Sequence, residues 1–343
     1  MINPRLRVTL LVIDALIAVV IVWLLVLSYV DRPQAGPKET IEIEAGETIS
    51  TVAAQLEKQH IVSSARSYRI FGWFNSAAKH PRAGTYTIQP GTNYNAIARL
   101  FALGPEQQEV QLRIIEGWNL NDISALLVAQ QVSSTAIQAS MGLQADRAAF
   151  DINWREEFAF LRALPPSRSL EGYLFPDTYR VWQAQLPEGL VRKQLQEFNT
   201  KYGSSTVPAK IAPLKSLDDV VILASVIEKE VRLPEERRRV AGIFLRRLRL
   251  GIPLQSDATL SYVTGSKRDR ATAQELGLNS PYNSYRFKGL PPTPICNPGA
   301  TAIDAVLNPI MGTDLYFLTD KEGKVYYAAT FEEHVRNKRK VGI

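Results

Sequence analysis

The chain has 343 residues, enough for two domains of ordinary size, and 45% of them are hydrophobic while 22% are charged, which excludes an intrinsically disordered protein. The formal net charge of +6 favours anionic partners such as nucleic acid, anionic lipid or an acidic polymer, without choosing among them. One cysteine and three histidines exclude an internal disulfide, CxxC metal sites and a histidine-rich metal centre.

An apolar run near the N-terminus extends from Val8 to Val30 and contains one charged residue, Asp14. A helix of that length spans roughly 35 Å, enough to cross the hydrocarbon core of a bilayer. Two arginines precede the run, and positive charge marks the cytoplasmic flank of a transmembrane helix. We therefore expect a cytoplasmic tail over residues 1–7 and a single transmembrane helix over residues 8–30. A cleaved signal peptide is the alternative.

A spacer rich in proline, glycine and charge, residues 31–39, precedes a pattern that occurs three times. In each copy a stretch of alternating apolar and polar residues, typical of a strand, leads to a glycine, and apolar residues then recur at helical spacing. The copies are Ala45–Leu56, Pro90–Phe101 and Glu116–Leu127, with Thr48, Asn93 and Asn119 as predicted helix N-caps. The repeated unit is therefore a strand, a glycine turn and a capped helix.

These βα units resemble LysM modules, which bind glycans that contain N-acetylglucosamine. The resemblance implies a LysM-like subdomain over residues 40–150, with glycan binding as its role. A purely structural role is the alternative, because βα units of this kind are generic. The region from about Ser140 to Pro166 is mixed and mostly helical, and we expect the domain boundary there.

Helices, short strands and proline-rich loops share the last part of the chain, residues 165–343. We expect this part to be one domain of mixed helices and strands that carries the chemistry. The whole chain is therefore predicted to have an α+β fold, made of a single N-terminal transmembrane helix, a LysM-like βα subdomain and this C-terminal domain.

Two helices are predicted in the middle of the C-terminal domain. The first runs from Lys215 to Arg232, where Ser216 and Asp219 form a capping-box pattern. The second runs from Pro234 to Leu250, with proline at its first position and acids in its first turn. Its arginines are expected to form a solvated face, with contact to peptide-stem carboxylates or lipid phosphates as the alternative: Arg237, Arg238, Arg239, Arg246, Arg247 and Arg249.

The first of these helices is apolar on every side between Val220 and Ile227 and then ends in two acids, Glu228 and Glu230. A helix that is apolar all round belongs to a protein core. Apolar surroundings and the negative end of the helix dipole both disfavour an ionised carboxylate, so both raise its pKa. A raised pKa suits a general acid near neutral pH. The alternative is that both carboxylates are solvated where the helix leaves the core.

Several long motifs occur in order along the chain: EGYLFPDTYR, LASVIEKE, ERRRVAGIFLRRLRLGIPLQSDATLSY and NSPYNSYRFKGLPPTPICNPG. Together they resemble the YceG-like family of membrane-anchored endolytic murein transglycosylases. The N-terminal apolar run and the LysM-like region agree with that family, so the resemblance covers essentially the whole chain. It implies a lytic enzyme that cleaves the β-1,4 bond between N-acetylmuramic acid and N-acetylglucosamine within peptidoglycan strands and leaves 1,6-anhydro-N-acetylmuramic acid ends.

The resemblance assigns catalysis to the first glutamate of the EKE sequence, Glu228, and we expect a supporting structural role for Glu230. Ordinary glycosidases need two carboxyls. A lytic reaction needs one, because the C6 hydroxyl of the sugar itself attacks C1 and no water has to be activated. One glutamate can protonate the leaving oxygen and later accept the C6 proton, and the tethered hydroxyl supplies effective concentration. No metal or cofactor is indicated.

A group of amide, carboxylate and aromatic residues follows the second helix, and these residue types suit a sugar cleft, which needs hydrogen-bond partners and aromatic faces. The expected substrate contacts are Gln255, Asp257, Asn279, Tyr282, Asn283 and Tyr285. Loop structure is the alternative for several of them, because Asn-Ser-Pro and Pro-Tyr-Asn favour turns.

The expected partners are peptidoglycan strands and, through residues 8–30, membrane lipid. The resemblance adds contact with the peptidoglycan synthases of the elongation machinery and a location at the inner membrane, with the catalytic domain on the periplasmic side. A membrane-anchored glycan-binding scaffold without activity is the first alternative. A nucleic-acid binder that uses the arginine-rich helix is the second, and the predicted anchor argues against it.

Overall fold

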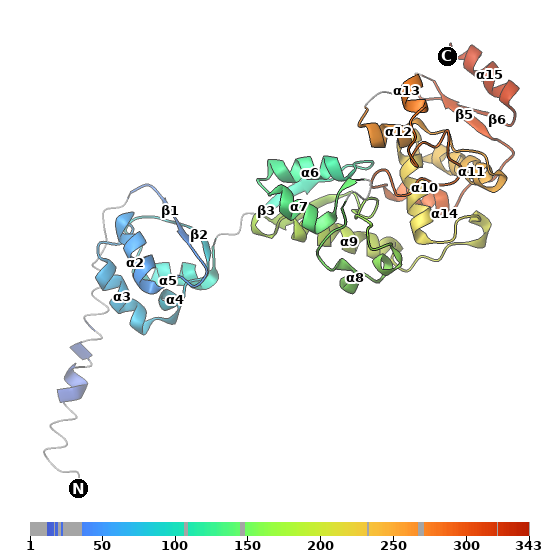
Figure 1. Cartoon of the computed structure of the whole chain (residues 1–343). Coiled ribbons are helices and arrows are strands. Elements are labelled where there is room, and N and C mark those ends of the chain that lie inside the picture. The colour runs from blue at the N-terminus through green and yellow to red at the C-terminus, as the bar shows by residue number, and fades with distance from the viewer. Residues whose placement is uncertain are drawn as a thin grey trace, which may run out of the picture. The chain divides into compact units, whose positions relative to one another are not determined.

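The computed structural model divides into two compact units, Met1–Gln107 and Gln108–Ile343 (Figure 1). Among the residues that it describes, no helix is both long enough and apolar enough to cross a membrane. The predicted tail, residues 1–7, and most of the predicted transmembrane helix, residues 8–30, lie outside the described residues. The structure describes residues 12–16, 18, 19, 22, 36–105, 109–144, 148–231, 233–266, 271–320 and 322–342.

The first unit contains the first two of the three predicted strand-turn-helix copies. Its two strands pair in antiparallel fashion, with Glu39 opposite Ile88 and Ile43 opposite Gly84. The side chains of Thr48 and Asn93 cap the helices that follow the glycine turns, as predicted. The elements are β1 (Glu39–Ile43), α2 (Ile49–Lys58), α3 (Ala65–Phe74), α4 (Ser76–Lys79), β2 (Gly84–Ile88) and α5 (Tyr94–Leu103).

The third copy belongs to the second unit. Its strand, β3 (Glu109–Arg113), pairs in antiparallel fashion with β4 (Thr178–Trp182), and Asn119 caps its helix, α6 (Leu120–Ala129), with a capping box. The division after Gln107 therefore differs from the expected subdomain over residues 40–150, because the partner strand of β3 comes from beyond that range.

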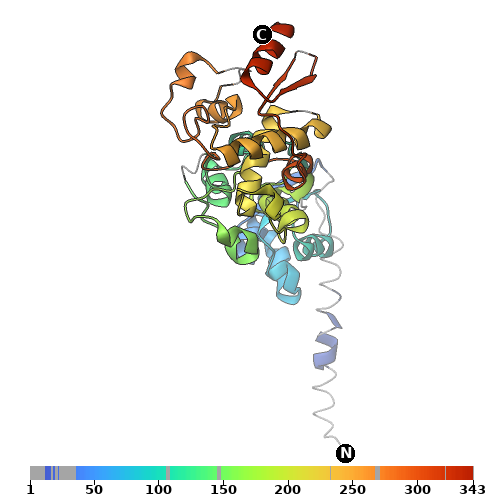
Figure 2. The same cartoon turned by 90° about the vertical axis from the view of Figure 1, so that its right-hand side faces the viewer.

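In its described residues, the second unit combines a helical core with two small antiparallel sheets, which confirms the mixed α+β class. Strands β5 (Tyr316–Thr319) and β6 (Val325–Ala328) form an antiparallel hairpin that packs against helix α15 (Phe331–Lys340) (Figure 2). The remaining elements are α7 (Ser134–Met141), α8 (Trp154–Glu157), η2 (Ala159–Ala163), η3 (Gln183–Gln185), α9 (Glu188–Tyr202), η4 (Ala209–Ile211), α10 (Leu217–Glu230), α11 (Pro234–Leu250), α12 (Asp257–Thr264), α13 (Ala273–Leu276) and α14 (Ala300–Leu307).

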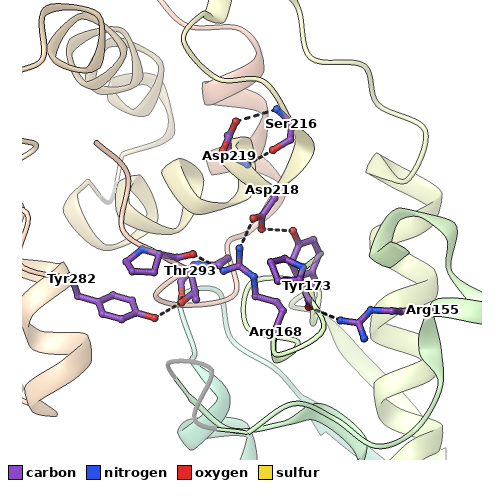
Figure 3. A network of polar contacts seen from close by, with 11 residues as sticks. Arg155, Arg168, Tyr173, Ser216, Asp218, Asp219, Tyr282 and Thr293 are labelled. Carbon is purple, nitrogen blue, oxygen red and sulfur yellow. Dashed lines mark hydrogen bonds and ion pairs between the residues drawn. The ribbon is translucent and has the colours of Figure 1, made fainter. Parts of the chain in front are cut away.

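Helix α10 is the central element of this core. Every residue from Val220 to Ile227 is buried, and the helix packs against α11, α12 and α14. Its first turn carries the predicted capping box, in which the Asp219 N–H donates to Ser216 Oγ at 3.1 Å and the Ser216 N–H donates to Asp219 Oδ2 at 3.1 Å (Figure 3). Burial on all sides and a satisfied N-terminus fix the position of the opposite end of the helix, where the glutamates lie.

The loop before β4, residues 168–177, is held against this core by two clusters of polar contacts. Tyr173 Oη donates to Asp218 Oδ1 at 2.7 Å, and Arg168 forms an ion pair with the same carboxylate (Figure 3). Asn297 accepts hydrogen bonds of 2.9 Å from the backbone N–H groups of Gly172 and Leu174. The loop is therefore held by buried side chains of distant segments, and it is structured although it has no regular secondary structure.

Candidate active site

Glu228 lies in the last turn of α10 and forms a bidentate ion pair with Arg237 of α11. Arg237 Nη2 donates to Glu228 Oε1 at 2.6 Å and Nη1 donates to Oε2 at 3.2 Å, while the N–H of Gly299 donates to Oε2 at 3.0 Å. The side chains of Glu228 and Arg237 are 5% and 6% exposed. Burial raises the pKa of Glu228, and Arg237 and the Gly299 amide act against that rise. Both carboxylate oxygens are therefore occupied by protein donors.

The expectation of a solvated arginine face on α11 is wrong for two of its members. Arg237 and Arg247 are buried, because they lie on the same side of the helix as Val240 and Phe244 of the core. Arg237 also donates to the backbone carbonyl of Val231 at 3.0 Å. Each buried guanidinium donates to polar partners, as a charge removed from water requires, although Nε of Arg247 has none among the described residues.

Glu230 is the last residue of α10 and meets the N-terminus of α12. The hydroxyl of Ser256 donates to its Oε1, and the N–H of Ala258 also stabilises the carboxylate. Burial nevertheless raises the pKa of Glu230 to about 7, and the charge of Asp257 adds to the rise. In the part of the chain that the structure describes, no ion pair to Glu230 is found. A carboxyl with this pKa is substantially protonated at neutral pH, as a general acid must be.

Glu230 lines a pocket of about 580 Å³, a volume that suits part of a glycan strand. Three of the six expected substrate contacts line the same pocket: Gln255, Asp257 and Tyr285. Glu228 is not among the lining residues. The structure therefore brings Glu230 together with half of the expected contacts, and directs Glu228 toward Arg237 instead.

Gln255 has a strained backbone and a fixed side chain. Its φ of 54° lies in the left-handed region, which residues other than glycine rarely adopt. Arg247 Nη2 donates to Gln255 Oε1 at 3.0 Å. Because arginine has no acceptor, this bond orients the amide and leaves the two N–H donors of Gln255 Nε2 for other partners. Gln255 is thus set to donate to an oxygen acceptor, and strain of this kind is typical of functional sites.

Asp257 and Tyr285 form a second polar pair in the pocket. The hydroxyl of Tyr285 donates to Asp257 Oδ1 at 2.8 Å, and burial, followed by this contact, raises the pKa of the tyrosine well above its ordinary value. Asp257 therefore has one oxygen engaged by a neutral hydroxyl, and its negative charge helps to keep Glu230 protonated.

The other three expected contacts do not line this pocket. Asn283 is fully buried and holds the loop together, because its Nδ2 donates to the carbonyls of Leu276 and Leu278 at 2.9 and 2.8 Å. Tyr282 is buried, and its hydroxyl hydrogen-bonds Thr293 Oγ1 at 2.8 Å. Asn279 is exposed. The loop alternative describes the contacts of Tyr282 and Asn283.

Strand β5 and helix α15 supply a wall of the pocket that sequence reasoning missed. The ring of Tyr316 stacks on His334, with centroids 5.2 Å apart, and Lys338 lies one helical turn further along α15. Burial, followed by the charges of Lys338 and Arg247, lowers the pKa of His334. The corresponding sequence pattern is an aromatic strand followed by a helix that carries His and Lys four residues apart. This pattern does not by itself indicate the pocket, because the contact with the pocket depends on the tertiary packing of the hairpin and α15. The wall consists of Leu315, Tyr316, Phe317, Leu318, Thr319, Phe331, His334 and Lys338.

Among the described residues, no group of three or more His, Cys, Asp or Glu side chains could hold a metal ion. Cys296 is fully buried, its thiol donates to the carbonyl of Ser225 at 3.3 Å, and burial raises its pKa well above the ordinary value. It is therefore a packed side chain and not a nucleophile.

A model of the YceG-like family matches residues 41–340. The chain belongs to the YceG-like family. This membership confirms the resemblance that the ordered motifs predict, and it covers both compact units.

Relatives of this YceG-like chain carry one shared name. This chain is 29% identical over 311 residues to "Endolytic murein transglycosylase" of Bacillus subtilis (strain 168), and the match covers 88% of this chain and 84% of that protein. It is 29% identical over 319 residues to a protein of the same name from Streptococcus pneumoniae (strain ATCC BAA-255 / R6), covering 87% of this chain and 57% of that protein. The chain therefore spans little more than half the length of the pneumococcal relative.

A solved structure is also similar. The crystal structure of a yceG-like protein from Listeria monocytogenes superposes on this YceG-like chain with a TM-score of 0.56 at 29% sequence identity, covering 88% of this chain and 99% of that one. The two chains thus share a fold over most of their lengths.

Proposed function

We propose that this protein is an endolytic lytic transglycosylase that cleaves the β-1,4 bond between N-acetylmuramic acid and N-acetylglucosamine within peptidoglycan strands. The observation that carries the proposal is a carboxyl with a pKa of about 7, Glu230, in a pocket with an oriented amide donor and a tyrosine–aspartate pair. The shared name of the relatives supports the same activity.

We assign the general acid to Glu230, whereas the resemblance to the family implies Glu228. The carboxylate of Glu228 already accepts three hydrogen bonds from Arg237 and Gly299, so donating a proton to a sugar would require breaking a buried ion pair. Burial raises the pKa of both carboxyls, but Glu230 has no cationic partner among the described residues and lines the pocket. The supporting structural role then belongs to Glu228.

In the proposed reaction Glu230 donates its proton to the glycosidic oxygen while the C6 hydroxyl of N-acetylmuramic acid attacks C1. The ionised Glu230 then accepts the proton of that hydroxyl, and a 1,6-anhydro end remains. Burial, aided by the charge of Asp257, favours the protonated form of Glu230 before the reaction. The amide N–H groups of Gln255 suit an oxygen acceptor such as the carbonyl of an N-acetyl group, and Tyr285 and Tyr316 supply aromatic surface.

We further propose that residues 8–30 anchor the chain in the inner membrane, with the second unit on the periplasmic side. The length of the apolar run and the arginines before it support this topology. The LysM-like character of the strand-turn-helix copies, contact with peptidoglycan synthases and termination of nascent strands near the membrane are part of the same proposal. Nucleic acid is not a partner in it.

The experiment is mass spectrometry of the fragments that the full-length chain in detergent releases from purified peptidoglycan. The wild type and Glu228→Gln are expected to yield anhydro-ended fragments, in proportion to the folded protein present, and Glu230→Gln to yield none. Fragments from Glu230→Gln but not from Glu228→Gln would restore the first assignment. Fragments with reducing ends would require a second carboxyl and a hydrolytic reaction.

The scaffold alternative predicts a different result. A folded wild-type chain that sediments with peptidoglycan and releases no fragments would be a binding protein. Its binding would also be indifferent to Glu230→Gln, because retention of a glycan needs no proton donor.

A further inference from the structure

The outer face of α3 in the first unit combines cations with exposed aromatic rings. Trp73 and Phe74, at the end of the helix, are 66% and 67% exposed. Arg66 and Arg69 are exposed on the same helix, and Lys79 is exposed on α4, which follows directly. We define these five residues as the α3 surface. Single exposed apolar residues are ordinary, but two large exposed rings adjacent in sequence, on a helix that also exposes two arginines, indicate an interaction surface.

The α3 surface is not a defect in the packing of this unit. The opposite face of α3 is well packed, because Tyr68 and Phe71 lie against the ring of Tyr94 with centroids 5.2 and 5.6 Å away. The sequence thus places two aromatic residues of α3 in the core and two outside it. Most of the surface of the outer pair stays in contact with water in the chain alone.

Charge is segregated along the first unit. From Lys58 to Pro105 the sequence contains no Asp or Glu, and all of the acids between residues 36 and 57 lie on or next to β1 and α2. The basic residues of the later segment are Lys58, Arg66, Arg69, Lys79, Arg82 and Arg99. The aromatic pair therefore lies in a segment of the sequence whose charged residues are all basic, which favours an anionic partner. An acid that contacts α3 is Glu57, whose Oε1 accepts from the N–H of Ala65 at the opposite end of the helix.

The place of this unit in the chain indicates which anionic partner is near. The predicted membrane span ends at Val30 and β1 begins at Glu39. Eight residues reach at most about 28 Å when fully extended, which is roughly the diameter of a unit of this size. The first unit is thus confined close to the bilayer surface. Exposed tryptophan, a second aromatic ring and arginine or lysine are the combination that binds the interface of an anionic membrane.

We propose that the α3 surface docks on anionic lipid headgroups, with Trp73 and Phe74 at the level of the interface and the three cations on lipid phosphates. This inference rests on the membrane anchor of the proposed function, and it adds a second contact that fixes the first unit against the bilayer. It is independent of the chemistry at Glu230.

The test reconstitutes the full-length chain in vesicles and measures the depth of a spin label at Ser76→Cys, beside Phe74. Cys296 is fully buried and stays unlabelled, so the site is unique. With phosphatidylglycerol in the vesicles, the collision rate of the label with oxygen, which partitions into the bilayer, is expected to rise. Its collision rate with a nickel complex that stays in water is expected to fall. The shift is expected to disappear in Trp73→Ser/Phe74→Ser, and to weaken in Arg66→Gln/Arg69→Gln or in roughly 1 M salt, where charges are screened within about 3 Å.

The matched control is Ala54→Cys, an exposed position on α2, where the label should stay in water in every vesicle. A label at position 76 that is as water-accessible as the control, in a chain that floats with the vesicles, would overturn the docking and leave the anchor intact. A chain that does not float would overturn the anchor and the docking with it. Immobilisation of the label by soluble chitooligosaccharide, with no response to anionic lipid, would assign the surface to glycan.

Discussion

Arg237 Nη2 lies 2.6 Å from Glu228 Oε1, and this ion pair joins the end of α10 to the start of α11 with both side chains almost fully buried. A buried pair of this kind contributes little net free energy when intact, but loss of one partner leaves an uncompensated charge in the core. Glu228→Gln should therefore lower the free energy of unfolding by about 3 kcal/mol or more. Denaturant unfolding monitored by circular dichroism measures the loss.

The control for this pair is the double variant Glu228→Met/Arg237→Met. It removes both charges together, so its loss should be smaller than the sum of the two single losses. Additive losses, or a Glu228→Gln variant as stable as the wild type, would contradict a structural role for the pair.

Glu230 should make stability depend on pH. Its pKa is about 7 in the folded chain against an ordinary value of 4.5, so the folded state retains a proton that the unfolded state loses between these values. The free energy of unfolding therefore falls as pH rises from 4.5 to 7, by up to about 3 kcal/mol, and is level above that range. The difference between wild type and Glu230→Gln, measured across this range, isolates the contribution; a flat difference would mean an unshifted carboxyl.

The carboxyl of Glu230 should also determine where the pH–rate profile of the reaction falls on its alkaline side. If Glu230 donates the proton, the rate of anhydro-end formation falls as pH rises through about 7. Asp257→Asn removes a negative charge that raises the pKa of Glu230, so this limb should move to lower pH. The position of the limb is the readout, because the rate itself also reflects substrate contacts. An unmoved limb would separate Asp257 from the titration of Glu230.

Gln255 should show opposite effects on stability and activity. Gln255→Gly removes a side chain from a left-handed backbone position, where a residue other than glycine is disfavoured by about 1–2 kcal/mol, and the greater chain entropy of glycine offsets part of that gain. The unfolding free energy should be unchanged or slightly higher, while kcat/KM falls because the amide donor is lost. Gln255→Ala is the control, since it loses the amide and keeps the strain. Full activity in both variants would exclude a substrate contact.

Local patterns predicted the elements that carry the site. The apolar run from Val220 to Ile227, its capping box and the proline at the start of α11 depend on neighbours within one or two helical turns, and these features have the predicted form. The caps at Thr48, Asn93 and Asn119 were predictable for the same reason.

The different surroundings of the two glutamates were not predictable in this way. A separation of two residues on a helix corresponds to a rotation of about 200°. Glu228 and Glu230 therefore lie on nearly opposite faces of α10 and contact different parts of the protein. Which of them faces a cation and which a pocket depends on how Arg237 of α11 and Ser256 of α12 dock, and no local pattern encodes that. The pairing of β3 with β4 escaped prediction likewise, because the two strands are more than sixty residues apart.

The hydrogen bonds of Asn297 limit the order in which the parts of the second unit can fold. Its amide accepts from Gly172 and Leu174 and donates to the carbonyl of Trp118 at 3.0 Å. A ribosome delivers residues 118 and 172 long before residue 297, so these backbone groups must wait for a partner from the far end of the polypeptide. The second unit therefore cannot be completed progressively from its N-terminal side. A chain truncated before Asn297 therefore loses more than its last segment. It also loses the side chain that holds the loop around Gly172 and Leu174 in place.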